Sequence, residues 1–327
     1  MRTDVTFPSA GLKLAGHLYA PDDGAVGPYP AIVVSHPGSG VKEQTAGLYA
    51  RRLAEKGFVA LAFDAAHQGE SEGEPRGLED PAHRVEDIKA AVSFLTTRDD
   101  VDTERIGALG ICASGGYVLA ATASDHRIRA VGTVSAADKP RPLRDGADGG
   151  QDPAVFQGML DAAAAARTAE ARGAGVQTFP IFPDTAEQAR ALGGRHAAEG
   201  FEYYCSDRAR HPRSAKSFTW SSVDRMAFFD GFRFVHLIAP RPLLMIVGRE
   251  AVTSWMSVEA YQKARAPKEL HWIDGASHVD LYDKEPYVGP AAEKLADFFR
   301  AQLTAAEQTS GRAAGSGAPP APTAWGR

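Results

Sequence analysis

Short apolar runs alternate with two-sided helical segments along the first half of the chain. The run at 31–34 is apolar and rich in β-branched residues, which is typical of a strand buried on both faces of a parallel sheet. Residues 45–56 carry apolar and polar positions at helical spacing, and Gly57 stands where a C-terminal cap is expected. Asp80-Pro81 provides a capping side chain followed by proline at the first helical position, which predicts a second helix.

The same alternation continues to the end of the patterned sequence. Strand–helix–strand order implies right-handed crossovers and predicts a doubly wound, mostly parallel α/β sheet. Further strands are predicted at 58–63, 105–110, 128–134, 242–247 and 269–273, with helices beginning near 116 and 290.

The pattern breaks between residues 138 and 235, where no clear buried strand occurs. Two helices are predicted at about 153–173 and 184–199, and nine of the chain's 28 aromatic residues fall within 201–234. This composition predicts a helical, aromatic-rich lid over an apolar pocket, although the rings could instead only anchor the insertion to the sheet. We therefore expect a core of residues 1–137 and 236–303 and a lid insertion of residues 138–235. Residues 304–327, rich in Ala, Gly, Pro and Ser without periodicity, are expected to form a disordered tail.

Composition and charge exclude several classes of protein. Hydrophobic residues make up 44% and charged residues 24% of the 327, close to the averages of soluble globular proteins. The net charge is −5, whereas nucleic-acid binders usually carry clustered positive charge. No apolar run approaches the roughly 18 residues that a membrane-spanning helix needs. Two cysteines and no apolar signal segment predict a cytoplasmic protein without a disulfide scaffold. No metal or nucleotide motif occurs, so no cofactor is expected.

The strongest chemical signal is the sequence GICASGG at 110–116, between a predicted strand and a predicted helix. A nucleophile elbow has the form Gly-x-nucleophile-x-Gly because its sharp turn tolerates only small neighbours. With the strand ending at Gly110, Cys112 is the nucleophile and Ser114 replaces the second glycine. A shifted register would make Ser114 the nucleophile but would push the turn two residues into the helix. The simpler alternative for Cys112 is a buried packing residue, whereas the helix N-terminus behind it predicts a lowered thiol pKa.

A nucleophile of this kind needs a base and a group that orients the base. His278 lies in a Gly-containing loop beyond the last predicted strand and is the preferred base. Glu250, just after the strand at 242–247, is the preferred acid, and Asp138, after the strand at 128–134, is the alternative. Each of the three could also be a solvated loop residue.

An oxyanion hole of backbone N–H groups completes the expected site. Ala113 should supply one N–H, and Gly38 or Ser39 the other, because Pro37 has none. Six further residues are candidates for contact with substrate: His36, His67, Ser114, Tyr203, Tyr204 and Trp220.

The chain resembles the α/β-hydrolase superfamily, and within it the dienelactone-hydrolase-like branch with cysteine at the elbow. The residues that carry this resemblance run from His36-Pro37-Gly38 through Asp64-x-x-x-x-Gly69-x-Ser71 to Gly110-Ile111-Cys112, with Ala239-Pro240-Arg241-Pro242-Leu243-Leu244 and His278-Val279-Asp280-Leu281-Tyr282. More narrowly, the chain is similar to the group of fungal polyketide transferases and bacterial hydrolases, over roughly residues 5–303. The resemblance implies an α/β-hydrolase fold with Cys112 as nucleophile, His278 as base and Glu250 as acid. Dienelactone hydrolases are shorter, so the insertion leaves the substrate open.

These residues predict acyl transfer through a Cys112 acyl-enzyme. Hydrolysis of an ester, lactone or thioester is the first hypothesis, and an acyltransferase or cyclase of secondary metabolism is the second, since thioesters pass acyl groups readily to other nucleophiles. A non-catalytic ligand-binding module is the third. The expected partner is a small acyl substrate, apolar in view of the aromatic insertion, and the oligomeric state stays open.

Overall fold

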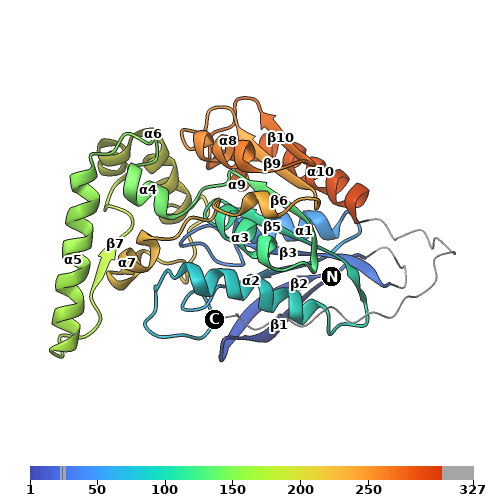
Figure 1. Cartoon of the computed structure of the whole chain (residues 1–327), viewed down its shortest axis with the longest axis horizontal. Helices are drawn as coiled ribbons and strands as arrows, with labels where there is room; N and C mark the ends of the chain where they lie inside the picture. Colours follow the sequence, from blue (N-terminus) through green and yellow to red (C-terminus); the bar gives the residue numbers. More distant parts are fainter. Residues whose placement is uncertain (23, 25–26, 304–327) are drawn as a thin grey trace, which may run out of the picture.

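The computed structural model of the chain, which describes residues 1–22, 24 and 27–303, is built around an eight-stranded sheet (Figure 1). Its order is β1-β2-β4-β3-β5-β6-β9-β10. The strands are β1 (Arg2–Ser9), β2 (Leu12–Tyr19), β3 (Tyr29–Ser35), β4 (Val59–Phe63), β5 (Val101–Ile111), β6 (Ile128–Val134), β9 (Leu243–Gly248) and β10 (Lys268–Ile273). All neighbours from β4 to β10 pair in parallel, while β2 is antiparallel to both β1 and β4. The predicted mostly parallel sheet is confirmed.

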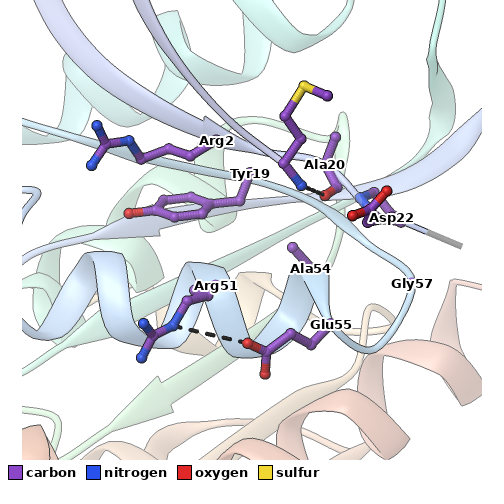
Figure 2. Close-up of a pocket in the computed structure, with 10 residues that line it drawn as sticks. Arg2, Tyr19, Ala20, Asp22, Arg51, Ala54, Glu55 and Gly57 are labelled. Carbon is purple, nitrogen blue, oxygen red and sulfur yellow. Dashed lines mark hydrogen bonds and ion pairs between the residues drawn. The ribbon is translucent and has the colours of Figure 1, made fainter.

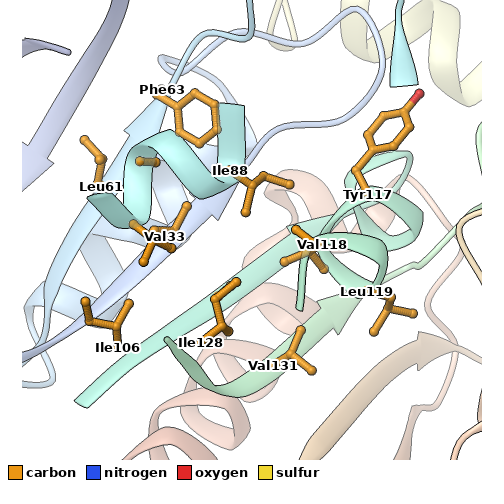
Figure 3. Close-up of a cluster of buried hydrophobic side chains, with 14 of the residues drawn as sticks. Val33, Leu61, Phe63, Ile88, Ile106, Tyr117, Val118, Leu119, Ile128 and Val131 are labelled. Carbon is orange, nitrogen blue, oxygen red and sulfur yellow. The ribbon is translucent and has the colours of Figure 1, made fainter. Parts of the chain in front are cut away.

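Helices cover both faces of this sheet. They are α1 (Thr45–Ala54), α2 (Pro81–Leu95), α3 (Ser114–Ser124), α8 (Ser254–Lys263), α9 (Asp280–Asp283) and α10 (Glu285–Gln302), with the 3-10 turn η1 (Val235–Leu237). On one face Val33 of β3 belongs to an apolar cluster with α2 and α3 (Figure 3). On the other face its neighbours Ile32 and Val34 belong to a cluster with α1 and α10. Alternate residues of one strand thus enter two cores, which explains its wholly apolar sequence.

Most predicted elements lie within a few residues of their expected positions. The strand at 128–134 has the predicted bounds, and Asp80 caps α2 by accepting a hydrogen bond from the Ala82 N–H. The last helix is an exception, because it begins at Glu285 instead of Pro290. Pro286 lies in its first turn, where a missing N–H costs no helical hydrogen bond.

The insertion of residues 138–235 forms a helical body beyond one end of the sheet (Figure 1). It contains α4 (Pro140–Asp145), α5 (Pro153–Ala171), α6 (Ala186–Cys205) and α7 (Ser221–Ala227), with the short antiparallel strands β7 (Thr178–Pro180) and β8 (Ser217–Thr219). Gly193 and Gly194 leave helical geometry and kink α6. The predicted tail at 304–327 lies outside the described residues. Within the described part of the chain, no helix combines the length and apolar character needed to cross a bilayer.

Candidate active site

Cys112 lies in a tight turn between β5 and α3. Its backbone has a φ of +55°, a left-handed conformation that is costly for any residue other than glycine. Gly110 makes this turn feasible, since a Cβ at that position would lie 2.1 Å from the carbonyl oxygen of Ser114. The strained turn holds the Cys112 side chain at the carboxyl edge of the parallel strands, where ligands bind in open α/β sheets.

The Cys112 side chain lines a pocket of about 180 Å³ at this edge. The core contributes Gly38, His278 and Tyr282, and the insertion contributes Phe182, His196 and Tyr204. The pocket therefore forms between the strand-end loops and the insertion.

Polar groups converge on the Cys112 thiol from three directions. The backbone N–H groups of Ala113 and Gly38 and the Tyr282 hydroxyl each lie near enough to the sulfur to favour its thiolate form. Of the two candidates in the first loop, Gly38 is thus the one whose N–H reaches the thiol, while the Ser39 hydroxyl donates to the Gly38 carbonyl at 2.5 Å.

Burial nevertheless raises the pKa of the Cys112 thiol above its ordinary value. The Tyr282 hydroxyl, the nearby Lys139 ammonium and the two N–H groups all act in the opposite direction, and burial outweighs them. The expectation of a lowered thiol pKa is therefore wrong, because desolvation destabilises the thiolate more than these neighbouring groups stabilise it. Cys112 is a neutral thiol at rest.

His278 is 2% exposed and has a partner on each ring nitrogen. Its Nδ1 lies 2.6 Å from Thr253 Oγ1, and its Nε2 lies 3.0 Å from the Tyr282 hydroxyl. Burial lowers the pKa of His278 to about 4, so the imidazole is neutral at physiological pH. A neutral imidazole beside a neutral thiol can act as a general base.

The predicted acid requires a correction. The Glu250 side chain is exposed, and its residue contacts the neighbouring loop through a backbone N–H bonded to Ala276 O. Asp138 is buried, but its Oδ1 accepts the Gly231 N–H at 3.0 Å. Among the described residues no carboxylate hydrogen-bonds the His278 ring, and Thr253, three residues beyond Glu250 on the same loop, takes that place.

Ser114 does not enter the pocket. Its hydroxyl donates to the His36 carbonyl at 2.5 Å and lies 2.9 Å from Ser35 Oγ. It also accepts the Arg84 Nη2 at 2.7 Å. The geometry therefore contradicts the shifted register, and Ser114 serves to tie the elbow to the end of β3.

We expect Ser114→Ala to lower the free energy of unfolding by about 1–3 kcal/mol, because it leaves the buried Arg84 guanidinium short of an acceptor. Urea unfolding would measure the change. Acylation at Cys112 should persist in this variant, and loss of the acyl adduct at unchanged stability would contradict the assignment.

The two other candidate histidines also lie outside the pocket. His36 is fully buried, with Nδ1 2.7 Å from the Pro37 carbonyl and Nε2 accepting the Ala65 N–H. His67 Nε2 lies 3.0 Å from His83 Nδ1. Both histidines shape loops.

Of the three aromatic candidates, only Tyr204 lines the pocket. The Tyr203 hydroxyl accepts the Thr45 N–H, and Trp220 packs on Phe179 at 4.6 Å between ring centroids. Tyr203 thus anchors the insertion to the core, which is the alternative that composition left open, whereas Trp220 packs within the insertion.

Several pocket residues, Tyr282 among them, were not among the predicted site residues, and two of the others carry titratable side chains. His196 of α6 packs edge-to-face on His278 at 4.9 Å, and its buried Nδ1 has no hydrogen-bond partner. Lys139, directly after Asp138, lines the same pocket. The Gly193-Gly194 pair shortly before His196 was the available signal for the kink that precedes this histidine.

One further cavity lies away from this chemistry, and another, of about 590 Å³, adjoins the active-site pocket through Phe182, Pro183 and Tyr204. A pocket of about 450 Å³ lies between the end of β2 and α1 (Figure 2), and none of the candidate residues lines it. In the part of the chain that the structure describes, no group of three or more His, Cys, Asp or Glu side chains could hold a metal ion.

Comparisons with known proteins bear on the family and the fold of this chain. The family model of the dienelactone hydrolase family matches residues 14–168. The uncharacterized protein YcjY of Escherichia coli K12 is 41% identical over 276 residues, covering 84% of this chain and 89% of YcjY. The crystal structure of hypothetical protein PA2218 from Pseudomonas aeruginosa superimposes with a TM-score of 0.85 at 34% identity, covering 92% of this chain and 94% of that one. Thiohydrolase aneE of Aspergillus aculeatus is 26% identical over 277 residues, covering 83% of this chain and 84% of aneE.

These matches extend over the core and the insertion together, and they support an enzyme over a non-catalytic binding module. The fold is that of the α/β hydrolases. The chain belongs to the dienelactone hydrolase family.

Proposed function

We propose that this chain hydrolyses an ester, lactone or thioester through an acyl-enzyme on Cys112. One observation carries the proposal: a cysteine held at a φ of +55° in a strand-to-helix turn, with its sulfur facing two backbone N–H groups inside a pocket. A residue kept only for packing would not require this strained conformation.

The reaction begins with attack of the Cys112 sulfur on the acyl carbon. The Ala113 and Gly38 N–H groups stabilise the oxyanion of the tetrahedral intermediate, and His278 receives the thiol proton. His278 then returns the proton to the leaving group as the intermediate collapses to a thioester. In the second half of the cycle an acceptor attacks this thioester and releases Cys112.

Water is the acceptor we favour, in keeping with the thiohydrolase among the relatives. Transfer to another nucleophile is the second candidate, because the insertion places the apolar side chains of Ile181, Phe182 and Ala197 around the pocket and limits access of water. These apolar side chains also favour a substrate with an apolar acyl group.

Intact-protein mass spectrometry after brief exposure to acyl thioesters and activated esters tests the proposal. We expect an acyl adduct on the wild-type protein that disappears in Cys112→Ala and persists in Cys205→Ala. Product analysis with and without an added amine or thiol separates hydrolysis from transfer. No adduct with any donor, or an adduct that survives Cys112→Ala, would overturn the proposal.

The acylation rate should fall on the acid side with a midpoint near pH 4 instead of near 6.5, the pKa of an ordinary histidine. The reason is that burial lowers the pKa of His278 to about 4. Below this value the imidazole carries a proton and cannot accept another, so the rate falls as pH falls. Single-turnover acylation across the acid range measures the midpoint, and far-UV circular dichroism confirms that the fold persists. A midpoint near 6.5 would show that a solvated group limits the reaction.

A further inference from the structure

The nucleophile and the base of this site are joined through a third side chain. Among the described residues no hydrogen bond connects Cys112 directly with His278. Instead the Tyr282 hydroxyl lies 3.0 Å from His278 Nε2, and Tyr282 lines the same pocket as Cys112, near enough for each to act on the pKa of the other. Tyr282 is four residues after His278, and it is 2% exposed, so bulk water does not compete for either contact.

The opposite side of the imidazole defines which nitrogen is free to accept a proton. Nδ1 lies 2.6 Å from the Thr253 hydroxyl, and a neutral imidazole carries one N–H. With that N–H on Nδ1 and donated to Thr253, Nε2 presents its lone pair to Tyr282. The Tyr282 O–H then donates to Nε2, and its oxygen is available to the thiol S–H.

We propose that the Tyr282 hydroxyl relays the proton between Cys112 and His278, which makes it a catalytic residue; this inference rests on the proposed function. As the sulfur attacks the acyl carbon, the S–H proton passes to the Tyr282 oxygen while the Tyr282 O–H proton passes to Nε2. Tyr282 ends the step as a neutral hydroxyl, His278 as imidazolium, and the electron pair of the S–H bond forms the C–S bond. In the collapse of the intermediate, the imidazolium returns its proton to the Tyr282 oxygen while the Tyr282 O–H proton passes to the leaving group, which takes the electrons of its bond to the acyl carbon.

The surroundings keep Tyr282 in the protonated form that a relay needs. Burial raises its pKa well above the ordinary value, and the neighbouring Cys112, Tyr204 and Tyr203 act in the same direction. The Tyr203 ring packs edge-on against it at 5.1 Å, and the Tyr204 ring lies at 6.5 Å. Lys139 and His196 are the remaining titratable groups of the pocket, beside His278 itself. Tyr282 thus passes protons in both directions without accumulating as an anion.

The decisive variant is Tyr282→Phe, which keeps the ring and removes the relay. Tyr203→Phe is the matched control, because it removes a buried neighbouring hydroxyl whose partner, the Thr45 N–H, lies outside the pocket. The measured quantity is the single-turnover rate of Cys112 acylation by an activated thioester as a function of pH, with thermal unfolding as a check on the fold.

At neutral pH we expect Tyr282→Phe to slow acylation by about 10²–10⁴-fold, the usual range for loss of general acid–base catalysis, and Tyr203→Phe to leave the rate unchanged. The loss should shrink as the pH rises past the thiol pKa, because a sulfur that is already deprotonated needs no relay. His278→Ala should show the same pH-dependent loss, and the double variant should be no slower than either single one, since both act on one proton path.

Two results would overturn the relay alone. Wild-type acylation rates in Tyr282→Phe would mean that His278 takes the proton directly. An equal loss at every pH would mean that the hydroxyl stabilises the oxyanion or only supports packing. Absence of an adduct from the wild-type protein with every donor would instead overturn the proposed function and the relay with it.

Discussion

Cys112→Ser is expected to lose acylation by about 10⁴-fold or more, although serine is the nucleophile of most hydrolases with this chain order. The reason is the partner of His278. A hydroxyl is a much weaker acid than a thiol and needs a strong base, and a buried carboxylate on Nδ1 normally supplies that strength. Here Nδ1 meets the Thr253 hydroxyl, which does not stabilise an imidazolium in the same way.

Single-turnover acylation by an activated ester measures this loss. Cys205→Ser is the matched control, since it makes the same exchange at a cysteine outside the active-site pocket and should retain the wild-type rate. Thermal unfolding should show that Cys112→Ser remains folded. A serine variant within tenfold of the wild-type protein would mean that a carboxylate orients His278 in solution and would reinstate a complete triad.

Lys42→Met is expected to cause the largest loss of stability, about 3–5 kcal/mol of the free energy of unfolding. The Lys42 side chain is buried, and its ammonium bonds Asp64 at 2.8 Å, Glu43 at 2.9 Å and Glu70 at 2.6 Å. Removing the cation leaves the Asp64 carboxylate, itself fully buried, with an uncompensated charge. Urea-induced unfolding gives the change.

Two further variants test whether the stranded charge causes the loss of stability. Lys13→Met removes a lysine that pairs with Glu72 at 3.5 Å on the surface and should change stability little, because exposed ion pairs contribute little. Asp64→Asn added to Lys42→Met should recover part of the loss by removing the stranded charge. Unchanged unfolding of Lys42→Met would refute the stabilising role of this network.

The elbow and the sheet could be predicted because local sequence determines them. A strand buried on both faces must be apolar at every position, as at 31–34, and a turn with a positive φ at Cys112 requires small neighbours such as Gly110. The edge hairpin β1–β2 was not predicted, since its residues are partly exposed and its pattern is weaker. Likewise, the density of aromatic residues at 201–234 indicated an insertion, but it did not show which of the rings line the pocket.

The sequence by itself determined the parallel strands of the sheet, the Cys112 elbow and the position of His278 in the loop beyond the last strand, because each depends on residues adjacent along the chain. Only the tertiary structure decided the partners of those residues. Glu250 and Thr253 share one loop, and its path over β9 and β10 turns the threonine, not the carboxylate, toward His278. Likewise burial of Cys112 in the folded chain raises the thiol pKa, whereas its local helix N-terminus predicted the opposite. The hydrogen-bond partner of His278 and the pKa of the Cys112 thiol depend on burial and on distances between segments that are far apart in the sequence. A local sequence pattern therefore does not predict them.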